Sequence, residues 1–247
     1  SDVCSSDLPP ALHTEFRGLL GGLQWLCTQG SPGISFDVNL LQSRSAAPNG
    51  HDLTRANKVL RTAWQMKDVT LRIVQLPRHF TWVTLTDAAH ANRPDLSSTS
   101  GHLIFGAHPN ILHGHTVQVS ILGWSSKKIR RKVRSSLGAE ASAMSTGLEH
   151  CDLVRVMFGE LSGDITDLGQ HEKYLRATKS LVLSDCKSLA DALNSTGSAS
   201  SKTSEDKRLC IEISMIKQRL EDSETQFQWV GWMLPQEHHI LDRIHEY

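Results

Sequence analysis

The sequence predicts an α/β fold, in which helices cover a mixed sheet, preceded by a helical segment at the N-terminus. Two observations lead to this prediction. Up to about residue 70 the apolar residues recur at helical spacing, whereas from Val69 onward the chain becomes a series of short runs rich in β-branched and aromatic residues. Beyond residue 135, strand-like runs alternate with amphipathic segments, which is typical of strands joined by crossover helices.

The N-terminal segment divides into a lead and three helices. Residues 1–13 are polar and contain proline, so they are expected to form a flexible lead. Apolar residues over 16–26 predict the first helix, and a second short helix follows the SPG turn. A third helix is predicted from Asp52 to Gln65, with Asp52 as its N-cap. Residues 14–72 hold no polar cluster that suggests chemistry.

Residues 78–247 are predicted to form the sheet and its helices. Three successive strands, in an antiparallel meander, are expected over FTWVTLTDA, GHLIFGA and TVQVSILGWSS. A long helix follows from about Gly138 to Leu161, then a polar loop, a strand SLVLS and a helix that starts near Asp185. A Ser/Thr-rich loop leads to an amphipathic helix over 205–222, and QFQWVGW is the last strand.

Composition excludes several classes of protein. The 26 Lys and Arg residues balance 26 Asp and Glu residues, so any contact with nucleic acid must come from a local basic patch. The five cysteines are widely spaced without a CxxC pair, which argues against a zinc site or a disulfide framework and favours a reducing compartment. No apolar run approaches the ~20 residues that span a bilayer, so no membrane partner is expected.

Three acids stand at the edge of buried faces. Asp87 ends a predicted strand and shares parity with Val83 and Leu85. Glu140 lies in the first turn of the long helix, on the stripe that continues through Met144. Asp185 closes the strand SLVLS. Carboxylates that converge in this way repel one another unless a cation lies among them, and Mg²⁺ suits such oxygen ligands.

Each acid taken alone has a plain structural explanation. Asp185 is as well explained as the N-cap of the helix that follows it. Glu140 is favourable near the positive end of any helix, and Asp87 could simply begin a turn. Only their joint occurrence in a β-β-β-α-β-α layout favours a functional site.

A basic run precedes the helix that carries Glu140. Six of the eight residues from 127 to 134 are Lys or Arg. If the run forms a strand, Lys128, Arg130, Lys132 and Arg134 line one face, while Lys127 and Arg131 share the other with Ile129 and Val133. Such a run is most often a solvated surface, but its place beside the acids suits a phosphate backbone, and Ser135 or Ser136 could cap the helix or donate to a phosphate.

Five motifs in order resemble the ribonuclease H domain of Ty1/copia-type retrotransposon Pol polyproteins. They are Asp87, the turn STSG at 98–101, WSSKK at 124–128, SS at 135–136 with Ala139-Glu140, and Asp185 with Lys187-Ser188. The segment before residue 72 is similar to the part of these polyproteins between the polymerase and the ribonuclease H domain, and is expected to be a remnant of the reverse transcriptase thumb or connection. The resemblance covers residues 16 to about 242.

The resemblance implies a ribonuclease H-like mixed five-stranded sheet flanked by helices, and a nuclease that cleaves the RNA strand of RNA–DNA hybrids. Its four acids would bind two Mg²⁺ or Mn²⁺ ions, which clamp the attacking and leaving oxygens. By carry-over these are Asp87, Glu140, Asp185 and Asp242. Asp242 is the poorer match, because the residues before it are out of step with the family's usual W-V-P run. The nucleic-acid contacts would come from Lys127, Lys128, Arg130, Arg131, Lys132, Arg134, Ser135 and Ser136.

The same resemblance sets the expected context and its rivals. No Y-x-D-D motif is present, so no polymerase activity is expected. The partners would be an RNA–DNA hybrid and the rest of the Pol polyprotein, inside the cell, in a cytoplasmic virus-like particle or the nucleus. One alternative is a catalytically inactive remnant that binds nucleic acid through its basic run. Another is a decayed fragment that is stable only within a longer polyprotein.

Overall fold

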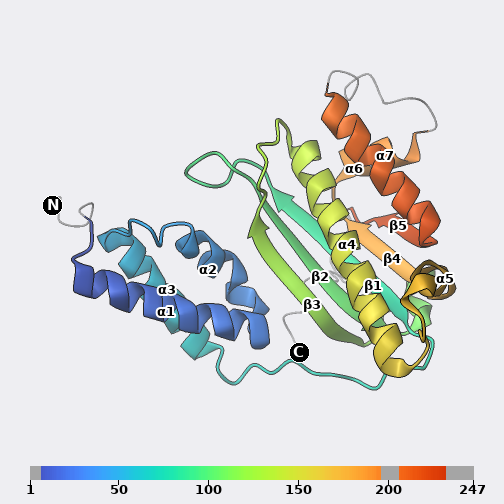
Figure 1. The fold of residues 1–247 in the computed structure, drawn as a ribbon, viewed down its shortest axis with the longest axis horizontal. Helices are drawn as coiled ribbons and strands as arrows, with labels where there is room; N and C mark the ends of the chain where they lie inside the picture. Colours follow the sequence, from blue (N-terminus) through green and yellow to red (C-terminus); the bar gives the residue numbers. More distant parts are fainter. Residues whose placement is uncertain (1–6, 196–205, 232–247) are drawn as a thin grey trace. The chain divides into compact units, whose positions relative to one another are not determined.

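The computed structural model describes residues 7–195 and 206–231 (Figure 1). The chain divides into two compact units. One comprises Ser1–Leu71 with Trp124–Lys128, and the other comprises Arg72–Gly123 with Ile129–Tyr247.

The N-terminal unit is helical. It contains α1 (Pro10–Gln29), a 3₁₀ turn η2 (Pro32–Ile34), α2 (Ser35–Gln42) and α3 (Gly50–Gln65). Its core is a set of buried apolar side chains from all three helices, including Phe16, Leu20, Leu23, Val38, Leu41, Ala56 and Val59. This unit has its own hydrophobic core, as the helical spacing of these residues requires.

Two helix starts in this unit differ from the sequence prediction. Helix α1 begins at Pro10, inside the expected flexible lead, because proline is well suited to the first helical position. Asp52 is not the N-cap of α3. Asn49 is the cap, and its side chain accepts from the Asp52 N–H while the Asp52 carboxylate accepts from the Asn49 N–H. This capping box begins the helix at Gly50.

The second element of the fold is a mixed five-stranded sheet in the order β3-β2-β1-β4-β5. The strands are β1 (Thr81–Ala89), β2 (Thr99–Ala107), β3 (Val119–Lys128), β4 (Ser180–Ser184) and β5 (Thr225–Trp229). Strand β1 pairs antiparallel with β2 and parallel with β4, which in turn pairs parallel with β5. The predicted mixed five-stranded α/β fold with an N-terminal helical segment is confirmed.

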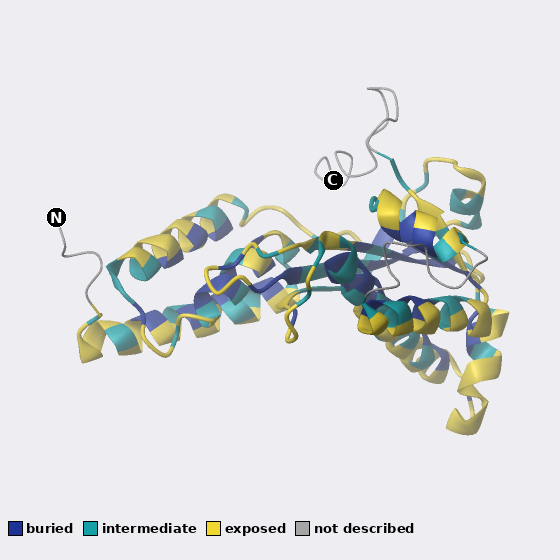
Figure 2. Cartoon of the chain, turned by 90° about the horizontal axis from the view of Figure 1, so that it is seen from above, coloured by how far each residue is buried: buried dark blue, intermediate teal, exposed yellow. Residues whose placement is uncertain are grey.

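Helices cover one face of this sheet. Side chains of α4 (Ser136–Ser162), α6 (Lys187–Asn194) and α7 (Lys207–Asp222) pack together with Val182 of β4. The opposite face carries another apolar cluster, built on Val83, Phe105, Leu181 and Leu183. Figure 2 shows that the helices are buried along one side and exposed along the other, as amphipathic helices on a sheet must be.

Three further differences from the sequence prediction affect the site. Helix α4 begins two residues earlier than expected, with Ser135 as N-cap. Helix α5 (His171–Ala177) and the 3₁₀ turns η3 (Pro109–His113) and η4 (Leu168–Gln170) were not predicted. Strand β3 ends at Lys128, so most of the basic run is irregular rather than strand.

Arg155 holds the missed helix α5 in place. Its guanidinium is fully buried and donates to the Leu175 and Thr178 carbonyl oxygens and to the Asp152 carboxylate. A buried charge is tolerated only with such partners. These contacts fix the segment that leads into β4, and Asp185 directly follows the last residue of that strand.

Candidate metal centre

The sheet brings two of the three acids to the carboxyl ends of adjacent strands. Strands β1 and β4 are parallel neighbours with Leu85 opposite Leu183. Asp87 and Asp185 each lie two residues further along, so they are at the same level of the sheet. The cross-strand partner of Asp87 on β2 is Gly101, the last residue of the STSG motif, which has no side chain to compete for the space. Because β2 begins at Thr99, most of this motif is strand rather than the expected turn. Adjacent parallel strands therefore place the two carboxylates side by side.

Helix α4 supplies the third acid. Glu140 is 8% exposed and continues the buried stripe of Met144, Leu148 and Cys151. The helix lies so close to the sheet that a Cβ at Gly147 would be only 2.7 Å from the Thr86 Cγ2 atom. The absence of a side chain at Gly147 permits this approach. Ser135 begins the helix by accepting from the Gly138 N–H at 3.1 Å. This close packing holds the Glu140 carboxylate beside those from β1 and β4.

The three carboxylates form one anionic cluster. One oxygen from each of Asp87, Glu140 and Asp185 lies within 4.8 Å of the others. Desolvation, followed by the charges of Asp87 and Asp185, raises the pKa of Glu140 to about 8. Desolvation and the charge of Asp185 also raise the pKa of Asp87, although that residue is exposed as a whole. The cluster therefore resists full ionisation in the absence of a cation.

The plain structural explanations do not hold for these acids. Asp185 does not cap α6, because Cys186 is the N-cap and no side chain caps that helix. The helix dipole acts most strongly on the first turn of a helix. Glu140 is the fifth residue of α4 and lies beyond that turn. Asp87 does not begin a turn, since β1 continues to Ala89. None of the three acids is explained by local chain geometry.

The donor set suits a hard divalent cation. All three side chains offer carboxylate oxygens, which are the ligands that Mg²⁺ and Mn²⁺ take. The Glu140 Oε2 atom is buried and accepts no hydrogen bond among the described residues. A buried, unpartnered carboxylate oxygen is costly, and a cation among the three groups would satisfy it. Asp242, the expected fourth acid, lies outside the described residues.

Most of the basic run forms an irregular segment that leads into α4, the helix of Glu140. All six Lys and Arg side chains are exposed, as is Ser136, while Ile129 is buried and its N–H donates to the Ser98 carbonyl. The condition for a two-faced strand is therefore met only up to Lys128, where β3 ends, because Ile129 anchors the chain to the β1–β2 turn. Whether these residues and Ser135 bind nucleic acid stays a prediction.

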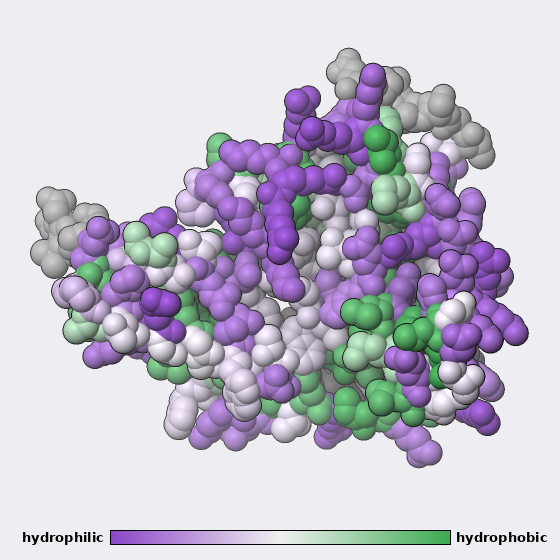
Figure 3. Space-filling view, in the orientation of Figure 1, coloured by the Kyte–Doolittle hydropathy of each residue, from purple (hydrophilic) through white to green (hydrophobic). Residues whose placement is uncertain are grey.

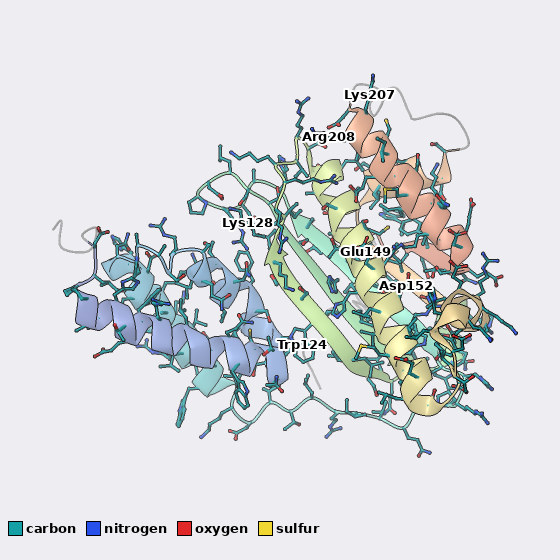
Figure 4. The ribbon with its side chains drawn as sticks, viewed as in Figure 1. Trp124, Lys128, Glu149, Asp152, Lys207 and Arg208 are labelled. Carbon is teal, nitrogen blue, oxygen red and sulfur yellow. The ribbon has the colours of Figure 1, made fainter. Side chains whose placement is uncertain are left out.

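Sequence reasoning missed a further basic pair. Arg131 contacts the Glu212 carboxylate on α7. Glu212 lies one turn after Arg208, and the exposed side chains of Lys207 and Arg208 begin that helix (Figure 4). More than 70 positions separate the pair from the basic run along the chain, so only tertiary structure brings the two together.

Comparison with curated proteins identifies a retrotransposon relative. The chain is 27% identical over 164 residues to the Retrovirus-related Pol polyprotein from transposon RE1 of Arabidopsis thaliana. The match covers 62% of this chain and 10% of the polyprotein, so the chain spans a small part of that relative's length. No family model matches the chain. The predicted resemblance to a retrotransposon Pol polyprotein is confirmed.

Among solved structures, viral reverse transcriptase proteins are similar to parts of this chain. The Prototype Foamy Virus protease–reverse transcriptase matches with a TM-score of 0.39 and 16% identity, over 70% of this chain and 20% of that one. The PFV RNase H domain matches with a TM-score of 0.35 and 14% identity, over 68% and 88%. The geometry of the acidic cluster, rather than these likenesses, supports the function proposed below. Within the described residues, no helix has the length and apolar character needed to cross a membrane.

Proposed function

We propose that this chain carries a ribonuclease H-type nuclease, which uses divalent metal ions to hydrolyse the RNA strand of an RNA–DNA hybrid. The observation that supports it is the meeting of three carboxylates from β1, α4 and β4 within 4.8 Å, with a buried oxygen of Glu140 left unpartnered. The likeness to a retrotransposon Pol polyprotein provides the context in which such hybrids occur.

Each acid has a distinct part in this proposal. Asp87 and Asp185 would hold the cations at the carboxyl ends of β1 and β4, while Glu140 would close the site from the buried side. Two Mg²⁺ or Mn²⁺ ions bound there would activate the attacking water and stabilise the leaving 3′ oxygen. Asp242 is proposed as the fourth ligand. Rigid strand ends and a close-packed helix hold the carboxylates in place before substrate arrives.

The exposed basic run is proposed to bind the phosphate backbone. Its Lys and Arg side chains, followed by Ser135 and Ser136, lead directly into the helix of Glu140. The exposed Lys207 and Arg208 on α7 extend this charge. Neutralising several phosphates in this way gives affinity that falls steeply with salt. The proposed setting is a longer Pol polyprotein inside the cell.

The direct test is cleavage of a labelled RNA–DNA hybrid by the full chain. We expect RNA cleavage in Mg²⁺ or Mn²⁺ and none in EDTA. Asp87→Asn should reduce the rate about 100-fold or more, because one anionic ligand is lost. Its stability should change by less than about 1 kcal/mol, since the isolated cluster opposes folding.

The matched control is Asp68→Asn, an exposed acid in the N-terminal unit. It should cleave at the wild-type rate. A folded wild-type chain that binds the hybrid in a salt-dependent manner, yet never cleaves it, would favour the alternative of a catalytically inactive binding module.

A further inference from the structure

An exposed tryptophan is held rigidly beside Asp185. Trp229 is the last residue of β5 and lies opposite Ser184, the residue before Asp185. Its indole N–H donates to the Asp185 carbonyl oxygen at 3.0 Å, yet the residue remains 43% exposed. A large aromatic side chain at a strand end usually turns into the core, so an indole kept at the surface requires another explanation.

Two further features fix the orientation of this ring. A Cβ at Gly231 would lie 2.7 Å from the indole Cη2 atom, so the glycine leaves room for the ring to fold over the chain. The Lys187 ammonium lies 5.2 Å from the ring centroid, and Lys187 is the first residue of α6, two positions after Asp185. The ring and the cation are thus both attached to the segment that carries a proposed metal ligand.

An exposed aromatic face paired with a cation is a suitable surface for a nucleotide. Bases and sugars stack on aromatic rings regardless of sequence, and an ammonium group neutralises the adjoining phosphate. Hydrophobic packing does not account for the arrangement, because Lys187 is 70% exposed and its salt bridge to Asp191 at 3.8 Å is on the surface.

We propose that Trp229 and Lys187 form a nucleotide-binding pair, which positions the substrate strand next to the acidic cluster. The ring contacts the sugar or base of one nucleotide, and the Lys187 ammonium contacts its phosphate. The inference deepens the proposed nuclease function and rests on it. The indole N–H also makes Trp229 a positioning residue for the Asp185 backbone.

The test is binding of a fluorescein-labelled 18-base-pair RNA–DNA hybrid to the full chain, followed by anisotropy in EDTA, where no cleavage is expected. Trp229→Leu should weaken binding about five-fold or more, the loss typical of one stacked base. Trp229→Phe keeps a ring but lacks the N–H. It should restore most of the affinity, while kcat in Mg²⁺ stays below that of the wild type because the Asp185 backbone has lost its donor.

Lys187→Gln provides a second variant that does not depend on the fold around the indole. It should reduce the slope of log affinity against log salt by about 0.7 to 0.9, as the loss of one phosphate contact requires. The control pair is Trp64 and Lys67 in the N-terminal unit, where an ammonium likewise lies 5.0 Å from an exposed ring. Trp64→Leu and Lys67→Gln should leave affinity and salt slope unchanged.

The outcomes separate this inference from the proposed function. Wild-type affinity in a folded Trp229→Leu chain, or an unchanged salt slope in Lys187→Gln, overturns the nucleotide-binding pair even if the chain cleaves RNA. Weakened binding in both variants supports the pair even if no cleavage occurs, in which case only the hydrolase is wrong. An equal loss of binding in the Trp64 and Lys67 controls also overturns it.

Discussion

At the scale of single residues, burial and mutual repulsion give Glu140 its character. Its side chain points from the core-facing stripe of α4 toward two other acids, and one of its oxygens has no hydrogen-bond partner among the described residues. Such a group weakens the metal-free fold when it is ionised. A bound cation would offset both the burial of the Glu140 carboxylate and its repulsion by the other two acids.

Glu140→Gln should stabilise the metal-free protein in a pH-dependent way. Because the folded-state pKa is raised from 4.5 to about 8, ionisation destabilises the fold progressively as pH rises between these values. In EDTA the variant should match the wild type near pH 4 and exceed it at pH 8.5. We expect a gain in unfolding free energy of about 1–3 kcal/mol, less than the full shift implies because the amide is also left unpartnered.

Urea unfolding at the two pH values measures this difference. The control is Glu149→Gln on the exposed side of the same helix, which should be neutral at both. Equal stability of wild type and Glu140→Gln at pH 8.5 would show that the three carboxylates do not repel one another in solution.

At the scale of elements, the separation between α4 and the sheet decides whether the acids meet. Gly147 allows the helix to approach the threonine side chains of β1, since a Cβ there would lie 2.7 Å from Thr86. Further along, α4 exposes the apolar side chains of Leu153, Met157 and Leu161. Figure 3 shows apolar surface over the lower part of this helix in that view. The helix is therefore tightly packed on the side that faces the sheet, and its outer side exposes apolar as well as polar residues.

Gly147→Ala should destabilise the protein by about 1–3 kcal/mol, because the added methyl group forces α4 away from β1. Gly22→Ala in α1, where nothing lies within 4 Å of the new Cβ, should instead stabilise by about 0.5–1 kcal/mol. Thermal or urea unfolding of the two variants measures both effects. A neutral Gly147→Ala substitution would mean that the helix is not seated as closely as described.

At the scale of the whole molecule, metal binding and folding should be linked. A cation that binds only the folded cluster stabilises it in proportion to the logarithm of its concentration. Mg²⁺ at about one hundred times its dissociation constant should raise Tm by roughly 5–10 °C. Differential scanning fluorimetry in EDTA and across a Mg²⁺ series checks this.

The variant Asp87→Asn should lose most of this rise in Tm, whereas the exposed control Asp68→Asn should retain it. An equal rise in both variants would assign the stabilisation to general ion effects rather than to the acidic cluster.

The amino-acid sequence alone predicts most of the elements and the three acids of the candidate site. Alternation, apolar stripes and five ordered motifs indicated the strands, the long helix and the acids at 87, 140 and 185, because these signals are local in the chain. The Ser135 cap of α4 was among the expected possibilities. The Asn49 cap of α3, helix α5 and the irregular path of the basic run were missed, since each depends on side-chain contacts such as those of Asn49, Arg155 and Ile129.

The meeting of the three acids follows from how the elements pack. Spacing along the chain cannot show that β1 and β4 are parallel neighbours in register, or that Gly147 lets α4 approach β1. The sequence likewise offered no indication of a functional role for Trp229, which is indicated only by its contact with Asp185. Local propensity fixes which residues belong to each element, but distances between charges depend on how the elements pack.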